Sequence, residues 1–181
     1  MYQGENKTAQ FSQRLIADAM LALLETESFA GLSVTEVCRR AQVSRQTFYS
    51  LFGTKEQVLA YALQADCCYE PGEREQECRS SCLREFCRGY SRYIVSNRNV
   101  LELLVRNDLM HCLYDMQVES LLSCRGFMEG LDRMERRYLV DFIASGMSSI
   151  ARTYVLTGCS LDAASLDRLM VRLFRGDLLE A

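Results

Sequence analysis

The sequence predicts an all-α fold, with a short N-terminal helical module followed by a longer helical region. Only one proline occurs in 181 residues, so long segments lack the residue that most strongly breaks helices. Apolar residues recur at intervals of three and four along much of the chain, which is the spacing of one helix face. Hydrophobic residues make up 49% of the sequence, enough for a substantial core.

The first predicted helix precedes a break at residues 28–31, where Ser and Gly interrupt the pattern. Its apolar positions share helical spacing, and they are Phe11, Leu15, Ile16, Ala19, Met20, Leu23 and Leu24. We expect this helix to support the two short helices that follow it.

Those two short helices are predicted between residues 33 and 52. Ser33 and Glu36 have the spacing of a capping box, which predicts a helix start near Val34. A narrow apolar stripe follows, made of Val34, Val37, Cys38 and Ala41. Ser44 is a second N-cap candidate only a few residues later. The two helices therefore meet at a tight turn.

The second of these helices has one apolar and one polar side. Phe48, Leu51 and Phe52 lie together and are expected to be buried. Gln46 and Tyr49 point the other way, with other polar side chains near the helix start. Arg, Gln and Thr in the first turns of a helix are able to read base edges in the major groove of DNA.

Positive charge is concentrated in the same stretch. Four basic residues, Arg39, Arg40, Arg45 and Lys55, stand there against Glu36, although the whole chain has a net charge of −3. Such a local balance suits phosphate. On pattern alone, an ordinary pair of surface helices remains the alternative.

Residues 43–59, VSRQTFYSLFGTKEQVL, resemble the signature of the TetR/AcrR family of transcriptional regulators. The matched positions are Val43, Ser44, Thr47, Phe48, Tyr49, Phe52, Lys55, Glu56 and Leu59. Ser50 and Leu51 depart from the family pattern, which often has a larger basic or polar residue followed by His or Asn. We therefore expect Leu51 to pack inward.

The resemblance implies an N-terminal three-helix DNA-binding domain with a helix-turn-helix, residues 1–65, and a C-terminal helical effector-binding and dimerisation domain, residues 66–181. It makes residues 33–40 the positioning helix and residues 44–51 the recognition helix. The DNA-binding residues that it implies are Thr35, Ser44, Arg45, Gln46, Thr47, Tyr49, Ser50 and Lys55. Among them, Arg45 to Thr47 would read bases, while Tyr49 and Lys55 would hold phosphates.

Beyond residue 65 the only clear boundary is the sole proline, Pro71, inside an acidic segment at residues 70–77. Helices are then predicted over residues 83–95, 100–105 and 109–127. Small-molecule pockets leave no motif in such helices. Six bulky residues are candidates for effector binding, although each is also a core candidate: Phe86, Tyr90, Tyr93, Met110, Tyr114 and Phe127.

Two strongly apolar helices end the chain. Their stripes are Leu139, Phe142, Ile143, Gly146, Met147, Ile150 and Tyr154, and then Leu166, Leu169, Met170 and Leu173. From the residues alone, both stripes either close the core of the subunit or pair with a second copy. The resemblance implies the second arrangement, a four-helix interface of a homodimer, and two recognition helices roughly 34 Å or a multiple apart would fit a palindromic site.

The function implied is a one-component transcriptional regulator, most often a repressor in this family, which binds a palindromic DNA operator as a homodimer. An unknown small-molecule effector in the C-terminal domain would change its affinity for double-stranded DNA. One alternative is a helical interaction protein of the same fold without small-molecule control.

A second alternative is a cysteine-based redox or metal sensor, because nine cysteines are many for such a chain. Cys78 and Cys82 are four residues apart, with Cys87 and the pair Cys67 and Cys68 nearby in sequence. Their spacing matches no zinc pattern, and a free cysteine is a common small core residue. No metal ligands or cofactor are assigned.

Enzyme motifs such as H-E-x-x-H, G-x-S-x-G and phosphate-binding glycine loops are missing from the sequence. No catalytic residues are expected, and the sequence does not predict an enzyme. The first ten residues have no apolar core, and no apolar run approaches a membrane span. The expected location is therefore the cytoplasm.

Overall fold

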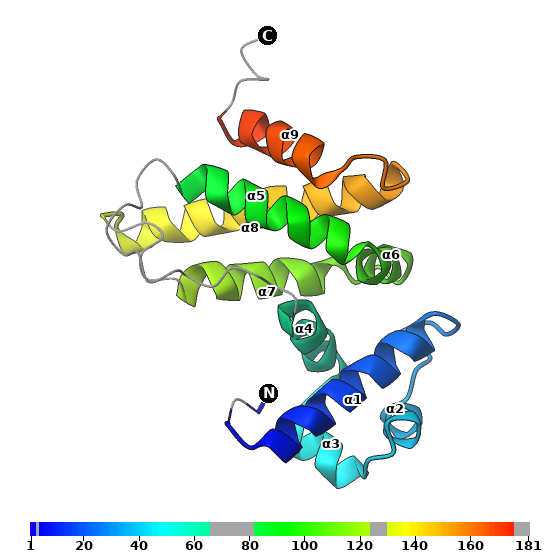
Figure 1. Ribbon diagram of the computed structural model, residues 1–181. Coiled ribbons are helices and arrows are strands. Elements are labelled where there is room, and N and C mark those ends of the chain that lie inside the picture. The colour runs from blue at the N-terminus through cyan, green and yellow to red at the C-terminus, as the bar shows by residue number, and fades with distance from the viewer. Residues whose placement is uncertain (3, 66–81, 124–129, 176–181) are drawn as a thin grey trace. The chain divides into compact units, whose positions relative to one another are not determined.

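The computed structural model describes the chain except residue 3 and residues 66–81, 124–129 and 176–181. All regular secondary structure in the described residues is helical (Figure 1), which confirms the all-α prediction. The chain divides into two compact units, Met1–Ala65 with Leu103–Leu113, and Asp66–Glu102 with Tyr114–Ala181. No helix among the described residues is long and apolar enough to cross a membrane.

Four helices open the first unit: α1 (Lys7–Leu24), α2 (Val34–Ala41), α3 (Arg45–Leu51) and α4 (Lys55–Ala65). Helix α1 packs against each of the other three. The largest side chains that are fully buried in this unit are Ile16, Met20, Leu24, Leu32, Phe48, Phe52, Leu59, Leu63, Leu104 and Leu113. A single apolar core therefore holds the short helices α2 and α3, which are too short to be stable alone.

The predicted stripe of α1 is confirmed except at its start. Phe11 is 63% exposed, whereas the polar side chain of Gln13 is buried. Two residues correspond to about 200° of rotation around a helix, so Phe11 lies on the side of α1 opposite Gln13. The apolar spacing predicted that Phe11 would be buried, but the face of α1 that the other helices cover includes Gln13 instead.

A segment far along the chain joins this unit. Helix α6 (Arg98–Arg106) and helix α7 (Met110–Ser123) meet within Leu103–Leu113. The Arg106 guanidinium donates a hydrogen bond to the Leu24 carbonyl at the end of α1. The Asn107 Oδ1 atom accepts the Phe29 N–H at 2.9 Å. These two residues fix the loop after α1 to the end of α6.

The second unit contains α5 (Cys82–Ser96), α8 (Arg133–Leu156) and α9 (Ala163–Arg175), with parts of α6 and α7. Helix α5 packs against α9. The helices predicted over residues 83–95 and 100–105 are confirmed, while the predicted end of the next one, at residues 124–127, lies outside the described residues.

Helix α8 begins earlier than its apolar stripe. Asp132 is its N-cap, and its side chain accepts the N–H groups of Met134 and Glu135 at 2.7 and 2.9 Å. The Glu135 side chain accepts the Asp132 N–H in return, which completes a capping box. The D-x-x-E spacing in the sequence carries this signal, although the first apolar residue of the predicted stripe is Leu139.

Candidate nucleic-acid interface

The helix-turn-helix is fixed by caps at both helix starts. Ser33 Oγ accepts the Glu36 N–H at 3.2 Å, and Glu36 Oε2 accepts the Ser33 N–H at 2.9 Å. Hydrogen bonds from the side chain and then the backbone of Ser33 hold the pKa of the Glu36 carboxyl below its usual value. Ser44 Oγ accepts the Thr47 N–H at 2.9 Å. Both predicted caps are confirmed.

Between the two helices, Gln42 ends α2 in the left-handed conformation, with φ 55°. Its N–H donates to the carbonyls of Cys38 and Arg39, and Val43 N–H donates to Cys38 O at 3.0 Å. These bonds satisfy carbonyls that a helix end leaves open. The turn is therefore tight and well bonded.

Helix α3 has a buried and an exposed side, as its sequence predicts. Phe48 and Leu51 are buried, and Phe52 follows them into the core. The inward position of Leu51, where the sequence leaves the family pattern, is confirmed. Phe48 also contacts the ring of Tyr49 edge to face, with centroids 5.4 Å apart, while Tyr49 itself is 51% exposed.

Six of the eight residues expected at DNA are exposed in this unit, and they are Thr35, Ser44, Arg45, Gln46, Tyr49 and Ser50. Thr47 is half-buried, and its hydroxyl lies 2.9 Å from Ser44 Oγ. Ser50 Oγ donates to the Thr47 carbonyl at 2.8 Å. The hydroxyls of Thr47 and Ser50 thus have local partners. Arg45 extends beside the Tyr49 ring, 6.0 Å from its centroid.

The eighth residue, Lys55, is half-buried and has partners that the sequence did not indicate. Its ammonium donates to the carbonyls of Phe29 and Leu32, each at 2.7 Å. It also lies 4.5 Å from the centroid of the Phe29 ring. Two of its three N–H groups therefore connect the start of α4 to the loop before α2.

The C-terminal stripes divide between the interior and the surface of the second unit. Five residues expected at a dimer interface are buried within the subunit itself, and they are Ile143, Met147, Tyr154, Leu166 and Met170. Leu139, Gly146, Ile150 and Leu169 are half-buried. Phe142 is 68% exposed and Leu173 is 43% exposed. Each stripe is wide enough for one edge to close the core while the other edge reaches solvent.

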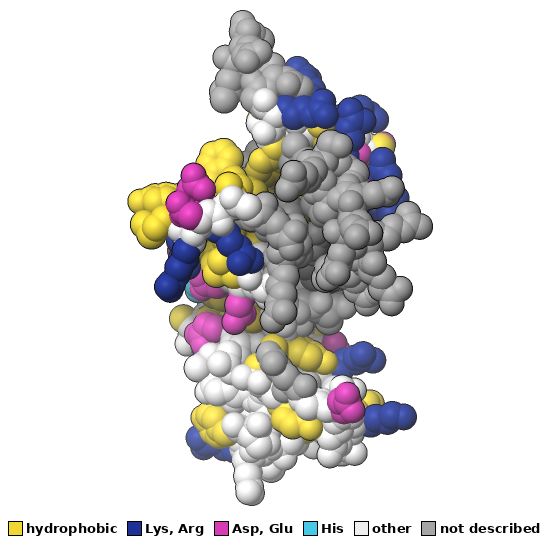
Figure 2. Space-filling model, turned by 90° about the vertical axis from the view of Figure 1, so that its left-hand side faces the viewer, with side chains coloured by type: hydrophobic (Ala, Val, Ile, Leu, Met, Phe, Trp, Pro, Cys, Tyr) yellow, Lys and Arg dark blue, Asp and Glu magenta, His cyan; other side chains and the backbone are white. Residues whose placement is uncertain are grey.

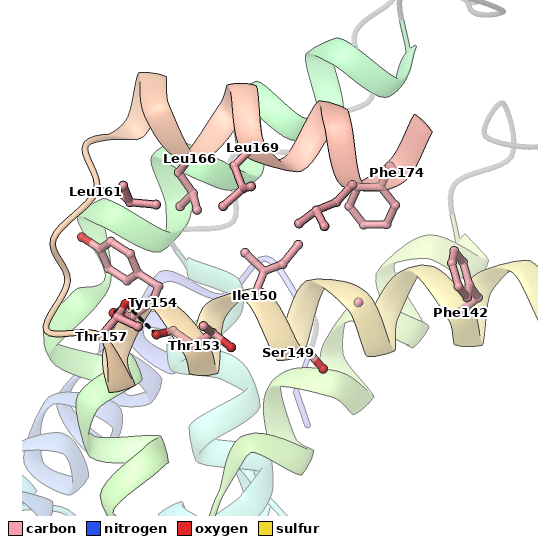
Figure 3. A pocket seen from close by; sticks show the side chains of 12 residues that line it. Phe142, Ser149, Ile150, Thr153, Tyr154, Thr157, Leu161, Leu166, Leu169 and Phe174 are labelled. Carbon is pink, nitrogen blue, oxygen red and sulfur yellow. Dashed lines mark hydrogen bonds between the residues drawn. The ribbon is translucent and has the colours of Figure 1, made fainter. Parts of the chain in front are cut away.

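A groove of about 410 Å³ runs between α8 and α9. Leu166, Leu169 and Phe174 lie on one side of it and face Ile150 and Tyr154 on the other (Figure 3). Among the lining residues are the exposed side chains of Phe142 and Leu173. Other apolar side chains also reach the surface of the molecule, and those on one face are the yellow atoms in Figure 2.

The effector candidates are only partly brought together. Phe86, Tyr90 and Tyr93 are buried along α5, and the Tyr90 ring lies 6.4 Å from Phe86 and 5.8 Å from Tyr93, nearly parallel to both. Met110 is half-buried and belongs to the first unit instead. Phe127 lies outside the described residues.

Tyr114, another candidate, is half-buried and bonded to α8. Its hydroxyl donates to Asp141 Oδ1 at 3.0 Å, and this hydrogen bond raises the pKa of the Tyr114 hydroxyl. Arg137 donates to the other oxygen of Asp141 at 2.9 Å. Tyr114 is thus engaged in a polar contact between α7 and α8.

A buried polar chain lies beside these aromatic residues and was not predicted. The Tyr90 hydroxyl donates to the Met147 carbonyl at 3.1 Å and accepts from Gln117 Nε2 at 2.6 Å. Ser148 Oγ donates to Gln117 Oε1 at 2.8 Å. The chain joins α5, α7 and α8, and no sequence pattern marks it because its members come from three separate helices.

The cysteine alternative receives little support from the described residues. Burial, and next the nearby Asp167 carboxylate, raise the pKa of the Cys87 thiol to about 12, which makes it a poor nucleophile and metal ligand. Cys67, Cys68, Cys78 and the side chain of Cys82 lie outside the described residues. Within the described part of the chain, no group of three His, Cys, Asp or Glu side chains is placed to hold a metal ion.

Comparison with known proteins agrees with this geometry. Residues 16–62 match the family model described as bacterial regulatory proteins, tetR family. The transcriptional activator DhaS of the dhaKLM operon from Lactococcus lactis subsp. lactis is 30% identical over 60 residues, which are 33% of this chain and 32% of that protein. The match thus spans about a third of the length of this curated relative.

Solved structures share the fold over nearly the whole chain. Lin0861 from Listeria innocua superposes with a TM-score of 0.77 at 17% identity, covering 97% of this chain and 95% of that one. NalD from Pseudomonas aeruginosa, the secondary repressor of the MexAB-OprM multidrug efflux pump, has a TM-score of 0.57 at 14% identity, covering 92% and 96%.

The chain therefore carries, at residues 16–62, the DNA-binding domain that defines the tetR family of bacterial regulatory proteins. Its fold is that of the family, with an N-terminal helix-turn-helix domain and a helical C-terminal domain. Proteins of this family are DNA-binding regulators and not enzymes, in agreement with the expectation from the sequence.

Proposed function

We propose that the protein is a one-component transcriptional regulator that binds operator DNA as a homodimer under the control of a small molecule. The observation that carries the proposal is the exposed polar face of α3 on a capped helix-turn-helix, made of Arg45, Gln46, Tyr49 and Ser50. DhaS is described as an activator and NalD as a repressor. The similarity of this chain to both proteins therefore supports operator binding, whether the protein activates or represses transcription.

Base reading falls to the side chains at the start of α3. Arg45 and Gln46 are exposed and long enough to form paired hydrogen bonds with base edges in the major groove. The Thr47 hydroxyl is turned toward Ser44, 2.9 Å away, so its share in base reading requires the rotation of that hydroxyl. Most of the specificity is thus assigned to Arg45 and Gln46.

Phosphate contacts flank the reading side chains. Thr35 and Tyr49 are exposed on α2 and α3, and their hydroxyls suit phosphate oxygens. Ser44 is able to donate to a phosphate oxygen when Thr47 is the donor of the bond that the two hydroxyls share. The single O–H of Ser50 donates to the Thr47 carbonyl, so a phosphate contact from Ser50 requires the rotation of that hydroxyl. Lys55 has one N–H group beyond the two that bind carbonyls, and we assign a phosphate contact to that group.

A second copy of the chain is the proposed occupant of the groove between α8 and α9. Burial of exposed apolar surface is favourable, and three exposed apolar side chains line the groove, Phe142, Leu161 and Leu173. A twofold dimer would place two copies of α3 on successive major-groove faces of a palindromic site. The residues proposed to contact the partner are Leu139, Phe142, Gly146, Ile150, Leu169 and Leu173.

Control by an effector is assigned to the second unit. Its core combines the aromatic residues of α5 with the polar chain of Tyr90, Gln117 and Ser148. Helix α6 contributes residues to both units. A ligand-induced change in the core of the second unit would therefore reach the first unit through this helix. Such a ligand releases DNA only if it binds the DNA-incompetent arrangement more tightly than the competent one.

The test of DNA binding begins by finding a sequence that the protein prefers. The purified protein is used to select sequences from random double-stranded DNA, and affinity for the enriched sequence is then measured by fluorescence anisotropy. We expect Arg45→Ala combined with Tyr49→Phe to weaken binding at least about 100-fold, because one base contact and one phosphate contact are lost.

The matched control is Arg152→Ala, which removes an exposed arginine from α8 in the second unit. We expect it to bind the selected DNA like the unmodified protein. If no sequence is enriched, or if the double variant binds as tightly as the control, α3 is not a recognition helix.

A further inference from the structure

We propose that Gln13 and the backbone of Tyr2 are positioning residues that hold the C-terminal end of the recognition helix α3. The inference rests on the proposed function, since it concerns how accurately α3 meets base edges. It assigns a role to a buried polar side chain and to a segment that precedes α1, neither of which belongs to the helix-turn-helix.

Gln13 is the first half of this connection. It lies on the covered face of α1 and is 2% exposed, an unusual place for a glutamine. A buried amide without a partner is costly. The Gln13 Nε2 group donates to the Tyr2 carbonyl at 3.0 Å. The side chain of Gln13 thus binds the backbone of the N-terminal segment.

Tyr2 is the second half. Its N–H donates to the Leu51 carbonyl at 2.8 Å, and Leu51 is the last residue of α3. The last carbonyls of a helix have no partner within the helix, so this bond satisfies one of them from outside. Two hydrogen bonds in series, Gln13 to Tyr2 and Tyr2 to Leu51, therefore connect α1 to the end of α3.

The segment itself is folded in a way that supports this connection. A Cβ atom added to Gly4 would lie 2.2 Å from the Tyr2 hydroxyl oxygen, so the Tyr2 ring occupies the space that a side chain at position 4 would need. Gln10 Nε2 donates to the Gly4 carbonyl at 3.3 Å. The carbonyls of Gly4 and Tyr2 are thus both bonded to side chains of α1.

The position of α3 depends on such contacts because the helix is only seven residues long and cannot hold itself. Ser44 fixes its start, and Tyr2 fixes its end. If the end is released, α3 is free to tilt about its apolar contacts, which moves Arg45 and Gln46 out of alignment with the base edges that they read. Base contacts require alignment, whereas phosphate contacts on random DNA tolerate such a tilt. The expected loss is therefore one of specificity.

The experiment uses the full chain and the DNA sequence selected by the unmodified protein. Gln13→Met keeps the volume of the side chain in the core and removes its donor. Tyr2→Pro removes the N–H that Leu51 accepts, while Tyr2→Ala is its control because it removes the ring and keeps that N–H. We expect Gln13→Met and Tyr2→Pro each to weaken binding to the selected DNA by about fivefold to tenfold.

Three further readouts separate positioning from a loss of folding. Affinity for random DNA and the salt slope should stay unchanged, since the phosphate contacts remain. Tyr2→Ala should bind the selected DNA within about twofold of the unmodified protein. The variant with both Gln13→Met and Tyr2→Pro should be no weaker than either single variant, because both act on one connection.

Each contrary result has a definite meaning. If the unmodified protein enriches no sequence, the proposed function fails. If it enriches one and both Gln13→Met and Tyr2→Pro bind it normally, the positioning role is overturned. An equal loss on selected and random DNA also overturns it, and so does a Tyr2→Ala variant as weak as Tyr2→Pro. Should Gln13→Met fail to fold, the comparison at Tyr2 decides.

Discussion

At the scale of single residues, Lys55 shows how one side chain is able to serve both the fold and a DNA contact. The family resemblance implied a phosphate contact for Lys55, but its two carbonyl partners belong to Phe29 and Leu32, more than 20 residues earlier in the chain. No local pattern predicts such partners, because they depend on how the loop after α1 folds over α4.

Replacing Lys55 by methionine should therefore have two effects. The free energy of unfolding should fall by about 2 kcal/mol, since charge-assisted hydrogen bonds to two carbonyls are lost. The slope of log affinity against log salt should fall by about one, because one phosphate contact is lost. Urea unfolding and a salt titration of DNA binding measure these quantities. An unchanged salt slope with lower stability would leave Lys55 with a structural role alone.

The capping box of α2 predicts a pH dependence. The pKa of Glu36 is lowered in the folded protein by hydrogen bonds from Ser33. A carboxyl of this kind stabilises the fold above its unfolded pKa, near 4.5, and that contribution is lost as pH falls through the folded value. Between pH 6 and pH 3, Glu36→Gln should therefore lose less stability than the unmodified protein.

The measurement is urea unfolding at a series of pH values. Glu56→Gln, at an exposed carboxyl in the first turn of α4, is the matched control and should follow the unmodified protein. Parallel curves for Glu36→Gln and the unmodified protein would contradict the role of the ionised capping box.

At the scale of helices, the signals that begin and end them are mostly local and could be predicted. The starts of α2 and α3 follow from Ser33 and Ser44, whose side chains act within three residues. What the sequence did not indicate is how helix ends are joined to one another. Asn107, at the end of α6, accepts a hydrogen bond from Phe29 and donates one to Leu103.

We expect Asn107→Ala to lower the free energy of unfolding by about 1–3 kcal/mol, because it leaves the Phe29 N–H without its partner. Asn107→Asp keeps an acceptor for that N–H and should be milder. Thermal unfolding followed by circular dichroism compares the two. Equal losses for both variants would show that the bond to Phe29 contributes little.

At the scale of the whole molecule, the proposed homodimer would decide whether two recognition helices meet one operator. The apolar stripes of α8 and α9 were readily predicted, but their division into a buried and an exposed edge was not. That division depends on α5, which packs against α9, and on the core that covers Ile143 and Met147.

Phe142→Glu should convert the proposed dimer into a monomer in sedimentation velocity, because it places a charge on the apolar contact proposed there. Phe11→Glu is the matched control, since Phe11 is similarly exposed on α1 in the other unit, and it should remain dimeric. A dimer that persists in both variants would place the interface elsewhere.

The sequence by itself determined the helical fold, the helix-turn-helix with its caps, and the inward position of Leu51, because these follow from spacing within one or two helical turns. Only the tertiary structure decided the partners of Lys55, the connection from Gln13 through Tyr2 to Leu51, and which edge of each apolar stripe reaches solvent. These features join residues that are distant in sequence, and their geometry exists only once the helices have packed.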